Sequence, residues 1–240
     1  MWSLFRTLLA ALVLIAFTGS AVVAYAQASP AAQQVLSRAR AATGGAAWGQ
    51  LRGVHEVGEE NGVRFERWID PLRYGIRTET HLKEGKFVQG YNGAGEWRIL
   101  TDGRHTGSID PPVLARIRTE AFLGGFAYFY PGRFDQRGSH LGSRKARGKT
   151  FDVVRISMEG GYPRELWFER KTGLLGIIVE QTGDQRVTTE FSDYRRAGPY
   201  RVPFKSMIIS AAGARTRTLQ SVEFKAPDRT LFSLPPPPRP

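Results

Sequence analysis

The side chains that could carry out chemistry are few, and they are scattered along the chain. His55, His81, His105 and His140 lie far apart, and none has the spacing of a metal-ligating pair. The absence of cysteine excludes disulfides and thiolate metal sites. No Gly-x-Ser-x-Gly motif and no phosphate-cradling glycine loop is present. The sequence therefore predicts no catalytic centre, no metal site and no cofactor, and it favours a binding protein over an enzyme.

Basic side chains are the most abundant charged groups. The chain has 34 Lys and Arg against 22 Asp and Glu, which gives a formal net charge of +12. Such a charge favours anionic partners, among them phospholipid headgroups, acidic polysaccharides and nucleic acids. The most basic stretch, 133–149, is better explained as a solvated loop and strand face than as a binding site.

The first 26 residues have the pattern of a secretory signal peptide. Arg6 precedes the apolar run 8–17, and Ala24-Tyr25-Ala26 places small residues at the two positions that signal peptidase reads. We therefore predict cleavage after Ala26 and a periplasmic location, which argues against a nucleic-acid partner. Retention of the segment as a membrane anchor is the alternative. No later segment is long and apolar enough to span a bilayer.

Short strands and tight turns dominate the rest of the chain. The stretch 164–195 predicts three antiparallel strands, because apolar and β-branched segments alternate with turns at Gly173 and Gly183. We interpret it as the centre of one antiparallel sheet. Asn61-Gly62 predicts another hairpin, since a type I′ turn needs two residues with positive φ.

Two segments predict helices. Ser29 and Pro30 have the residue types of a cap and a first helical position, and Gly44-Gly45 ends this helix. The second helix spans 112–123, where apolar residues recur at helical spacing.

About eleven strands and the two helices follow one another without a linker. We therefore predict one mainly β (α+β) domain, 27–233, after the signal peptide 1–26 and before a proline-rich extended tail, 234–240. An antiparallel sheet of this length must curl to cover its apolar face. The two helices are then expected to cover what the curved sheet leaves open.

The segment 126–130 holds four aromatic residues in five positions, directly after Gly124-Gly125. One interpretation is a plug of core aromatics beneath the sheet. The other is a movable apolar lid that hinges at the two glycines.

Five motifs follow one another along the predicted mature chain. They are Gly-Gly-x-x-Trp-x-x-Leu at 44–51, the Asn-Gly turn and strand at 92–97, Leu-Trp-Phe-Glu-x-x-Thr-Gly-Leu-Leu at 166–175, Ser-Asp-Tyr at 192–194 and Asp-x-x-Leu-Phe-x-x-Pro at 228–235. This pattern resembles the LolA-like superfamily of periplasmic proteins, which includes the outer-membrane lipoprotein carrier. The resemblance implies an unclosed β-barrel whose mouth is covered by helices and whose concavity holds acyl chains or other apolar groups.

We expect an aromatic and aliphatic cavity between the sheet and the second helix. The expected lining is Trp68, Phe87, Tyr91, Trp97, Ile99, Leu114 and Ile117, with Phe122 and Tyr128 at the mouth. In the lipoprotein carrier an arginine near an early strand latches the lid, and the resemblance offers Arg67, Arg73 and Arg77 for that role. Arginines at the rim are also expected to bind an acidic headgroup.

Three functional hypotheses follow from the sequence. The first is a periplasmic carrier or binding protein for a lipid, acyl chain or other apolar or anionic lipid-like ligand. The second is a non-enzymatic sensor or protein-interaction module of the cell envelope, whose concave face takes a lipoprotein or an envelope protein. The third is an enzyme of unrecognised type. Under either of the first two hypotheses the protein could contact the membrane peripherally. We expect the protein to be a monomer.

Overall fold

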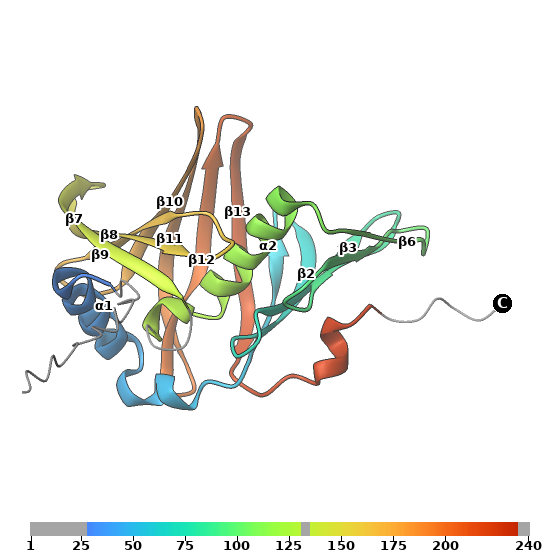
Figure 1. Ribbon diagram of the computed structural model, residues 1–240, viewed down its shortest axis with the longest axis horizontal. Helices are drawn as coiled ribbons and strands as arrows, with labels where there is room; N and C mark the ends of the chain where they lie inside the picture. The colour runs from blue at the N-terminus through green and yellow to red at the C-terminus, as the bar shows by residue number, and fades with distance from the viewer. Residues whose placement is uncertain (1–27, 131–134, 235–240) are drawn as a thin grey trace, which may run out of the picture.

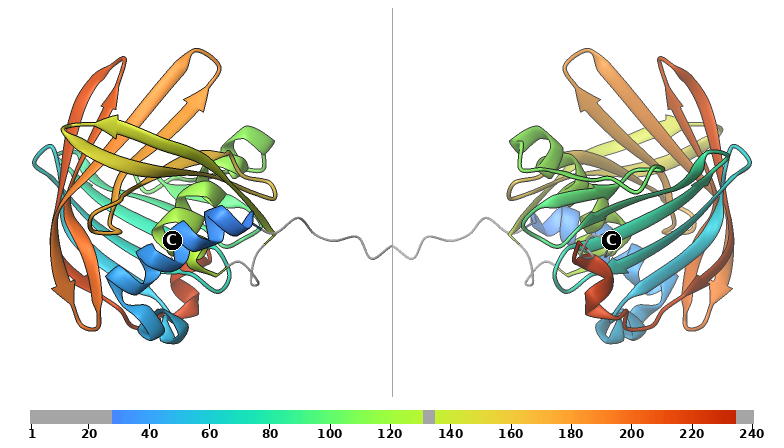
Figure 2. Two further views of the ribbon diagram at one scale, coloured as in Figure 1. Left: turned by 90° about the vertical axis from the view of Figure 1, so that its left-hand side faces the viewer. Right: turned by 90° about the vertical axis from the view of Figure 1, so that its right-hand side faces the viewer.

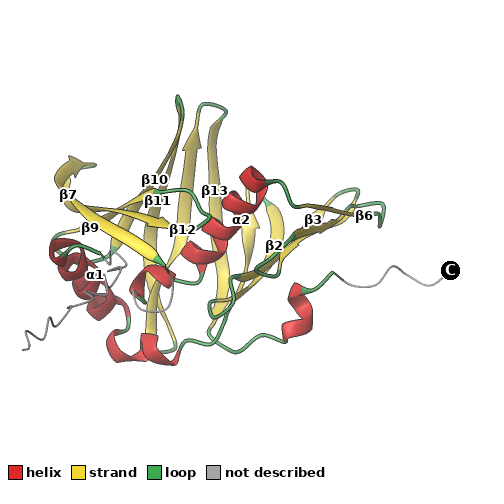
Figure 3. Cartoon of the chain, viewed as in Figure 1, coloured by secondary structure: helices red, strands yellow, loops and turns green. Residues whose placement is uncertain are grey.

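The structure, a computed structural model, describes residues 28–130 and 135–234. The predicted signal peptide and residues 235–240 of the proline-rich tail lie outside the described residues. Across the described residues, a single large antiparallel sheet curves around two helices, as expected for a mainly β fold (Figures 1 and 3).

The sheet has thirteen strands, two more than the approximate number predicted. The strands are β1 (Val54–Glu60), β2 (Val63–Asp70), β3 (Gly75–Leu82), β4 (Gly85–Tyr91), β5 (Glu96–Ile99), β6 (His105–Ser108), β7 (Gln136–Ala146), β8 (Lys149–Met158), β9 (Arg164–Glu169), β10 (Leu175–Thr182), β11 (Gln185–Ala197), β12 (Tyr200–Ser210) and β13 (Gly213–Glu223). The α-helices are α1 (Pro30–Thr43) and α2 (Pro111–Gly124), and the 3₁₀ helices are η1 (Gly45–Gln50), η2 (Ala127–Phe129) and η3 (Arg229–Phe232).

The order of strands in the sheet differs from their order in the chain. The chain runs outward from β1 to β6, crosses through α2 and η2 to the opposite edge, and returns from β7 to β13, which pairs with β1. Strands β9 to β11 therefore lie toward one edge, and the expectation that they form the centre of the sheet is wrong. In the described residues β6 and β7 do not pair with each other, so the barrel is unclosed.

The predicted hairpin at Asn61-Gly62 is confirmed. Asn61 and Gly62 have φ of 50° and 79°, as a type I′ turn requires, and Glu60 pairs with Val63 across them. The turn therefore fixes which side chains of β1 and β2 share a face of the sheet.

A β-bulge bends the centre of the sheet where β1 meets β13. The register shifts between Val57 and Gly58, and a Cβ on Gly58 would lie 2.4 Å from the carbonyl oxygen of Thr218. Only glycine permits this close approach of two backbones, and a bulge increases the local twist.

Helix α1 begins and ends at the predicted residues. Ser29 Oγ accepts a hydrogen bond from the Ala32 amide at 3.3 Å, and Pro30 occupies the first helical position. The buried face of α1, which includes Val35 and Leu36, packs against β7, β8 and β12. Figure 2 shows the sheet wrapping around α1 and α2.

An aromatic cluster closes one end of the molecule. Trp48 is fully buried, and its ring lies 4.4 Å from that of Tyr200, 4.7 Å from that of Phe126 and 5.2 Å from that of Phe129. The Tyr130 hydroxyl donates a hydrogen bond to the Trp48 carbonyl oxygen. The segment 126–130 thus occupies the position of a core plug in this structure.

Candidate functional site

A cavity of about 580 Å³ lies between the concave face of the sheet, helix α2 and the aromatic segment at η2. Its volume is within the range of roughly 300–1,000 Å³ that is typical of small-molecule pockets. Side chains and backbone from most strands of the sheet contribute to it, so the curvature of the sheet creates the space.

A large share of the cavity wall is apolar. It is made by residues that share the inner face of β9 to β13 and by the aromatic plug: Phe126, Tyr128, Phe129, Phe168, Leu175, Ile178, Phe191, Val202, Leu219 and Val222. Burial raises the pKa of the Tyr128 hydroxyl well above its usual range.

Much of the rest of the wall is polar, and several of its charged groups form cross-strand ion pairs. Arg67 Nε donates to Glu56 Oε2 at 2.8 Å, between directly opposed residues of β2 and β1. Glu60 binds two arginines of β13: its Oε2 accepts from Arg217 Nη2 at 2.6 Å, and its Oε1 accepts from Arg215 Nη1 at 3.0 Å.

A fourth ion pair lies across the cavity, beneath α2. Arg164 Nη2 lies 2.8 Å from Glu180 Oε2, and the Arg164 side chain is only 6% exposed. Burial lowers the pKa of Arg164, although the charges of Glu180 and Glu120 oppose this shift. In total, seven basic and four acidic residues line the cavity, so the lining carries a positive charge when all of them are ionised.

Helix α2 spans the open side of the barrel and is tied to both halves of the sheet (Figure 1). Arg118 Nε donates to the Tyr91 hydroxyl at the end of β4, at 3.0 Å. The Tyr162 amide, just before β9, donates to Thr119 Oγ1 at 2.8 Å. These contacts place the inner side of α2, including Arg116, Glu120 and Leu123, over the cavity.

Two of the twelve residues expected at the site line this cavity. They are Arg67 on β2 and Tyr128 in η2. Arg67 is ion-paired with Glu56, and Tyr128 belongs to the apolar wall.

Four others pack around α2 instead of lining the cavity. Tyr91, Ile117 and Phe122 are almost completely buried in the core, and Leu114 packs against the same core. Leu114, Ile117 and Phe122 belong to α2, which contacts strands β2, β3 and β5, and this packing fills the space that we expected to remain open.

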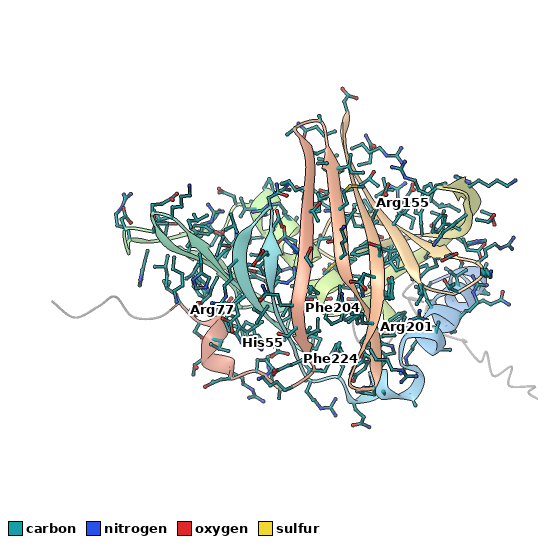
Figure 4. The ribbon with its side chains drawn as sticks, turned by 180° about the vertical axis from the view of Figure 1, so that it is seen from behind. His55, Arg77, Arg155, Arg201, Phe204 and Phe224 are labelled. Carbon is teal, nitrogen blue, oxygen red and sulfur yellow. The ribbon has the colours of Figure 1, made fainter. Side chains whose placement is uncertain are left out.

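Four of the expected residues lie on the outer face, so their expected orientation is wrong. Trp68 stacks on His55 at 5.0 Å, and Arg77 lies 5.6 Å above the ring of Trp97. Ile99 lies two residues after Trp97 on β5. Because alternate residues of a strand point to the same face of the sheet, Ile99 shares the outer face. Figure 4 views the sheet from behind and labels His55 and Arg77 there.

The last two expected residues also lie away from the cavity lining. Phe87 is half-buried on β4, and Arg73 pairs with Asp70 at 3.3 Å in the turn between β2 and β3. None of Arg67, Arg73 and Arg77 makes a hydrogen bond to α2 among the described residues. The arginine that ties α2 to the sheet is Arg118, which belongs to the helix itself.

Most of the lining was not expected from the sequence, although one signal was present. Along β1 the residues Val54, Glu56, Gly58 and Glu60 share one face, and two of them are acidic. Charged residues at buried positions of a strand indicate either an ion pair or a site. The pairing of β1 with β13, which the sequence did not predict, brings Arg217 beside Glu60.

Solved structures share this fold at low sequence identity. A LolA superfamily protein from Nitrosomonas europaea is 10% identical and gives a TM-score of 0.56, with 85% of this chain and 97% of that chain covered. A domain assigned by its name to outer-membrane lipoprotein sorting, from Vibrio parahaemolyticus, is 12% identical and gives 0.55, with 84% and 96% covered.

A DUF1329 family protein from Desulfovibrio piger gives a TM-score of 0.58 at 9% identity, with 85% of this chain and 96% of that chain covered. No protein-family model matches the sequence, and no curated protein matches it significantly. Similarity at these identities establishes the fold alone. Together with the thirteen-stranded unclosed sheet and the bridging helix, it shows that this chain has the LolA-like fold.

Proposed function

We propose that this protein is a periplasmic, non-enzymatic carrier or binding protein that holds a lipid, an acyl chain or another apolar ligand in its half-open barrel. The observation that carries the proposal is the cavity of about 580 Å³, whose apolar wall lies beneath a helix that bridges the open side. Burial of an acyl chain there would contribute roughly 0.8 kcal/mol per methylene.

The charge of the cavity supports a preference for anionic ligands. Its lining has seven basic residues and four acidic ones. An apolar tail and an acidic headgroup would therefore both find complementary surface in one cavity.

The proposed location depends on the N-terminal sequence. The apolar run and Ala24-Tyr25-Ala26 support export and cleavage after Ala26. Among the described residues, no helix is long and apolar enough to cross a membrane. After cleavage, residues 27–233 would act as a single domain.

A native mass spectrum of the protein purified from the periplasm tests this proposal. We expect a population heavier than the polypeptide by the mass of a lipid, which organic extraction removes. A mass equal to that of the bare polypeptide, together with no uptake of added lipids, would contradict the carrier proposal. That outcome would favour the alternative of a sensor or protein-interaction module that uses the same concave face.

A further inference from the structure

Two arginines enter the cavity from the strands on either side of β1. Arg67 on β2 and Arg217 on β13 both line it, with side chains 19% and 29% exposed. Each is held by a glutamate of β1, and the Arg217 guanidinium lies 5.0 Å above the ring of Phe65. Their orientation is therefore fixed before any ligand binds, which reduces the entropic cost of binding.

Each of these guanidinium groups keeps unused donors. Arg67 and Arg217 both bind their glutamate through Nε and Nη2, and both nitrogens share one carboxylate oxygen, Glu56 Oε2 or Glu60 Oε2. No described residue accepts a hydrogen bond from Nη1 of either arginine. Since a guanidinium has five N–H donors, both side chains can bind a further anion without releasing their glutamates.

The cluster also carries an excess of one positive charge. It contains three arginines, Arg67, Arg215 and Arg217, against the two glutamates Glu56 and Glu60. Burial lowers the pKa of Arg217, and the nearby charge of Arg67 lowers it further. One added negative charge would neutralise the cluster and relieve this repulsion.

Two other cavity arginines, Arg164 and Arg116, are less suited to a ligand. Arg164 contacts Glu180 and the Pro163 carbonyl oxygen, and it lies 5.9 Å from the ring of Tyr162. Arg116 is 45% exposed on α2 and pairs with Glu120 within the helix, an arrangement that contributes little to stability or binding.

We propose that Arg67 and Arg217 form the headgroup subsite for a single-chain amphiphile with one negative charge, whose tail lies on the apolar wall at Phe168, Ile178 and Phe191. This inference rests on the proposed function and adds the ligand class and the position of its headgroup. A carboxylate and a phosphodiester both provide two acceptor oxygens for guanidinium groups. The cavity volume of about 580 Å³ favours one acyl chain over two.

Binding of three probes to the purified protein tests the subsite. The probes are palmitate, palmitoyl-lysophosphatidylglycerol and hexadecanol, so that the first two carry one negative charge and the third carries none. We expect at least one anionic probe to bind about tenfold more tightly than hexadecanol, as a charge-assisted hydrogen bond allows. A preference for palmitate identifies a carboxylate ligand, and a preference for the lysophospholipid identifies a phosphodiester.

Substitutions test whether Arg67 and Arg217 cause the preference for anionic probes. Arg217→Gln should remove about tenfold of the affinity for the anionic probe and leave hexadecanol binding unchanged. Arg215 remains to pair with Glu60 in this variant. Arg67→Gln should act in the same way, and it provides the test if Arg217→Gln does not fold. Arg155→Gln is the matched control, because Arg155 is an exposed arginine outside the cavity (Figure 4).

The outcomes separate this inference from the function on which it rests. Equal binding of all three probes by the wild type, or an unchanged anion preference in both cavity variants, would overturn the subsite and leave the apolar carrier intact. Failure of every probe to bind would overturn both.

Discussion

Asp152 on β8 joins α1 to the sheet through an ion pair. Its Oδ2 accepts a hydrogen bond from Arg38 of α1 at 2.6 Å, and its Oδ1 accepts one from Ser143 of β7 at 2.9 Å. Arg170 adds an ion pair at 3.1 Å. Burial raises the pKa of Asp152, but these partners outweigh it, and the pKa lies below its usual value.

This carboxylate makes the stability of the protein depend on pH. Because the folded-state pKa is lowered, the stabilisation is complete above the unfolded-state pKa of about 3.9 and is lost as the pH falls through the lower folded-state value. We predict that Asp152→Asn lowers the free energy of unfolding by about 1–3 kcal/mol at pH 7, and that the difference from the wild type shrinks below about pH 4.

Urea denaturation at a series of pH values measures this effect. Asp184→Asn is the control, since Asp184 lies exposed in a turn and makes no ion pair among the described residues. A loss of stability in Asp152→Asn that is the same at pH 3 and pH 7 would show that the charge of Asp152 does not hold α1.

The sequence predicts turns and caps better than it predicts ion pairs. Asn61-Gly62 and Ser29-Pro30 were placed correctly because their geometry depends on neighbouring residues alone. The partners of Asp152 come from α1 and from two other positions along the chain, so no local pattern could identify them. The ion pairs of the cavity wall were missed for the same reason.

Among the elements, α2 is the one that decides whether the barrel stays covered. It is held to one half of the sheet through Arg118 and Tyr91, and to the other half through Thr119 and Tyr162. Thr119 is 2% exposed, and its hydroxyl also donates to the Ala115 carbonyl oxygen at 2.7 Å. Loss of that hydroxyl would leave the Tyr162 amide without its acceptor.

We predict that Thr119→Val destabilises the protein by about 1–3 kcal/mol, because it preserves the shape of the side chain but removes the hydrogen bond. Relative to the wild type, amide hydrogen exchange in Thr119→Val should increase more in α2 and at Tyr162 than in the strands. Thr218→Val is the matched control, since Thr218 is exposed and its side chain makes no hydrogen bond among the described residues. Unchanged exchange in α2 of Thr119→Val would show that this contact does not secure the helix.

The helix itself was predictable, but the side on which it packs was not. Apolar spacing placed α2 within one residue of its observed bounds. The same spacing could not distinguish the side chains that fill the core, such as Ile117 and Phe122, from those that border the cavity, such as Leu123. That distinction depends on the strands that the helix contacts.

At the scale of the whole molecule, the crossover through α2 determines the site. It brings the last strand, β13, beside the first, β1, and leaves β6 and β7 as the two edges of an unclosed barrel. Most of the strands and the curled sheet could be predicted from alternating patterns and turns, although the sheet has two strands more than expected. The pairing of β1 with β13 joins residues more than 150 positions apart, as in Glu60 and Arg217, and local patterns contain no information about it.

The sequence patterns also did not predict which face of the sheet each large side chain occupies. Trp68 and Trp97 are large aromatic residues, and we expected them inside the cavity. In the structure Trp68 stacks on His55, and Trp97 donates its indole N–H to the Phe232 carbonyl oxygen of η3 at 2.8 Å. The outer face of β3 to β5 thus has its own apolar cover, supplied by the C-terminal segment.

Titration of a fluorescent fatty acid against the wild type and two matched variants measures whether the cavity binds an apolar ligand. Ile178→Glu places a charge on the apolar wall of the cavity, whereas Ile209→Glu places the same charge on a half-buried isoleucine that does not line it. Circular dichroism establishes that both variants are folded.

We predict that the wild type and Ile209→Glu bind the fatty acid with similar affinity, and that Ile178→Glu loses at least about tenfold, because an ionised carboxylate in the wall opposes burial of the acyl chain. Equal binding by all three proteins, or no binding by the wild type at any chain length, would show that the cavity does not hold an acyl chain.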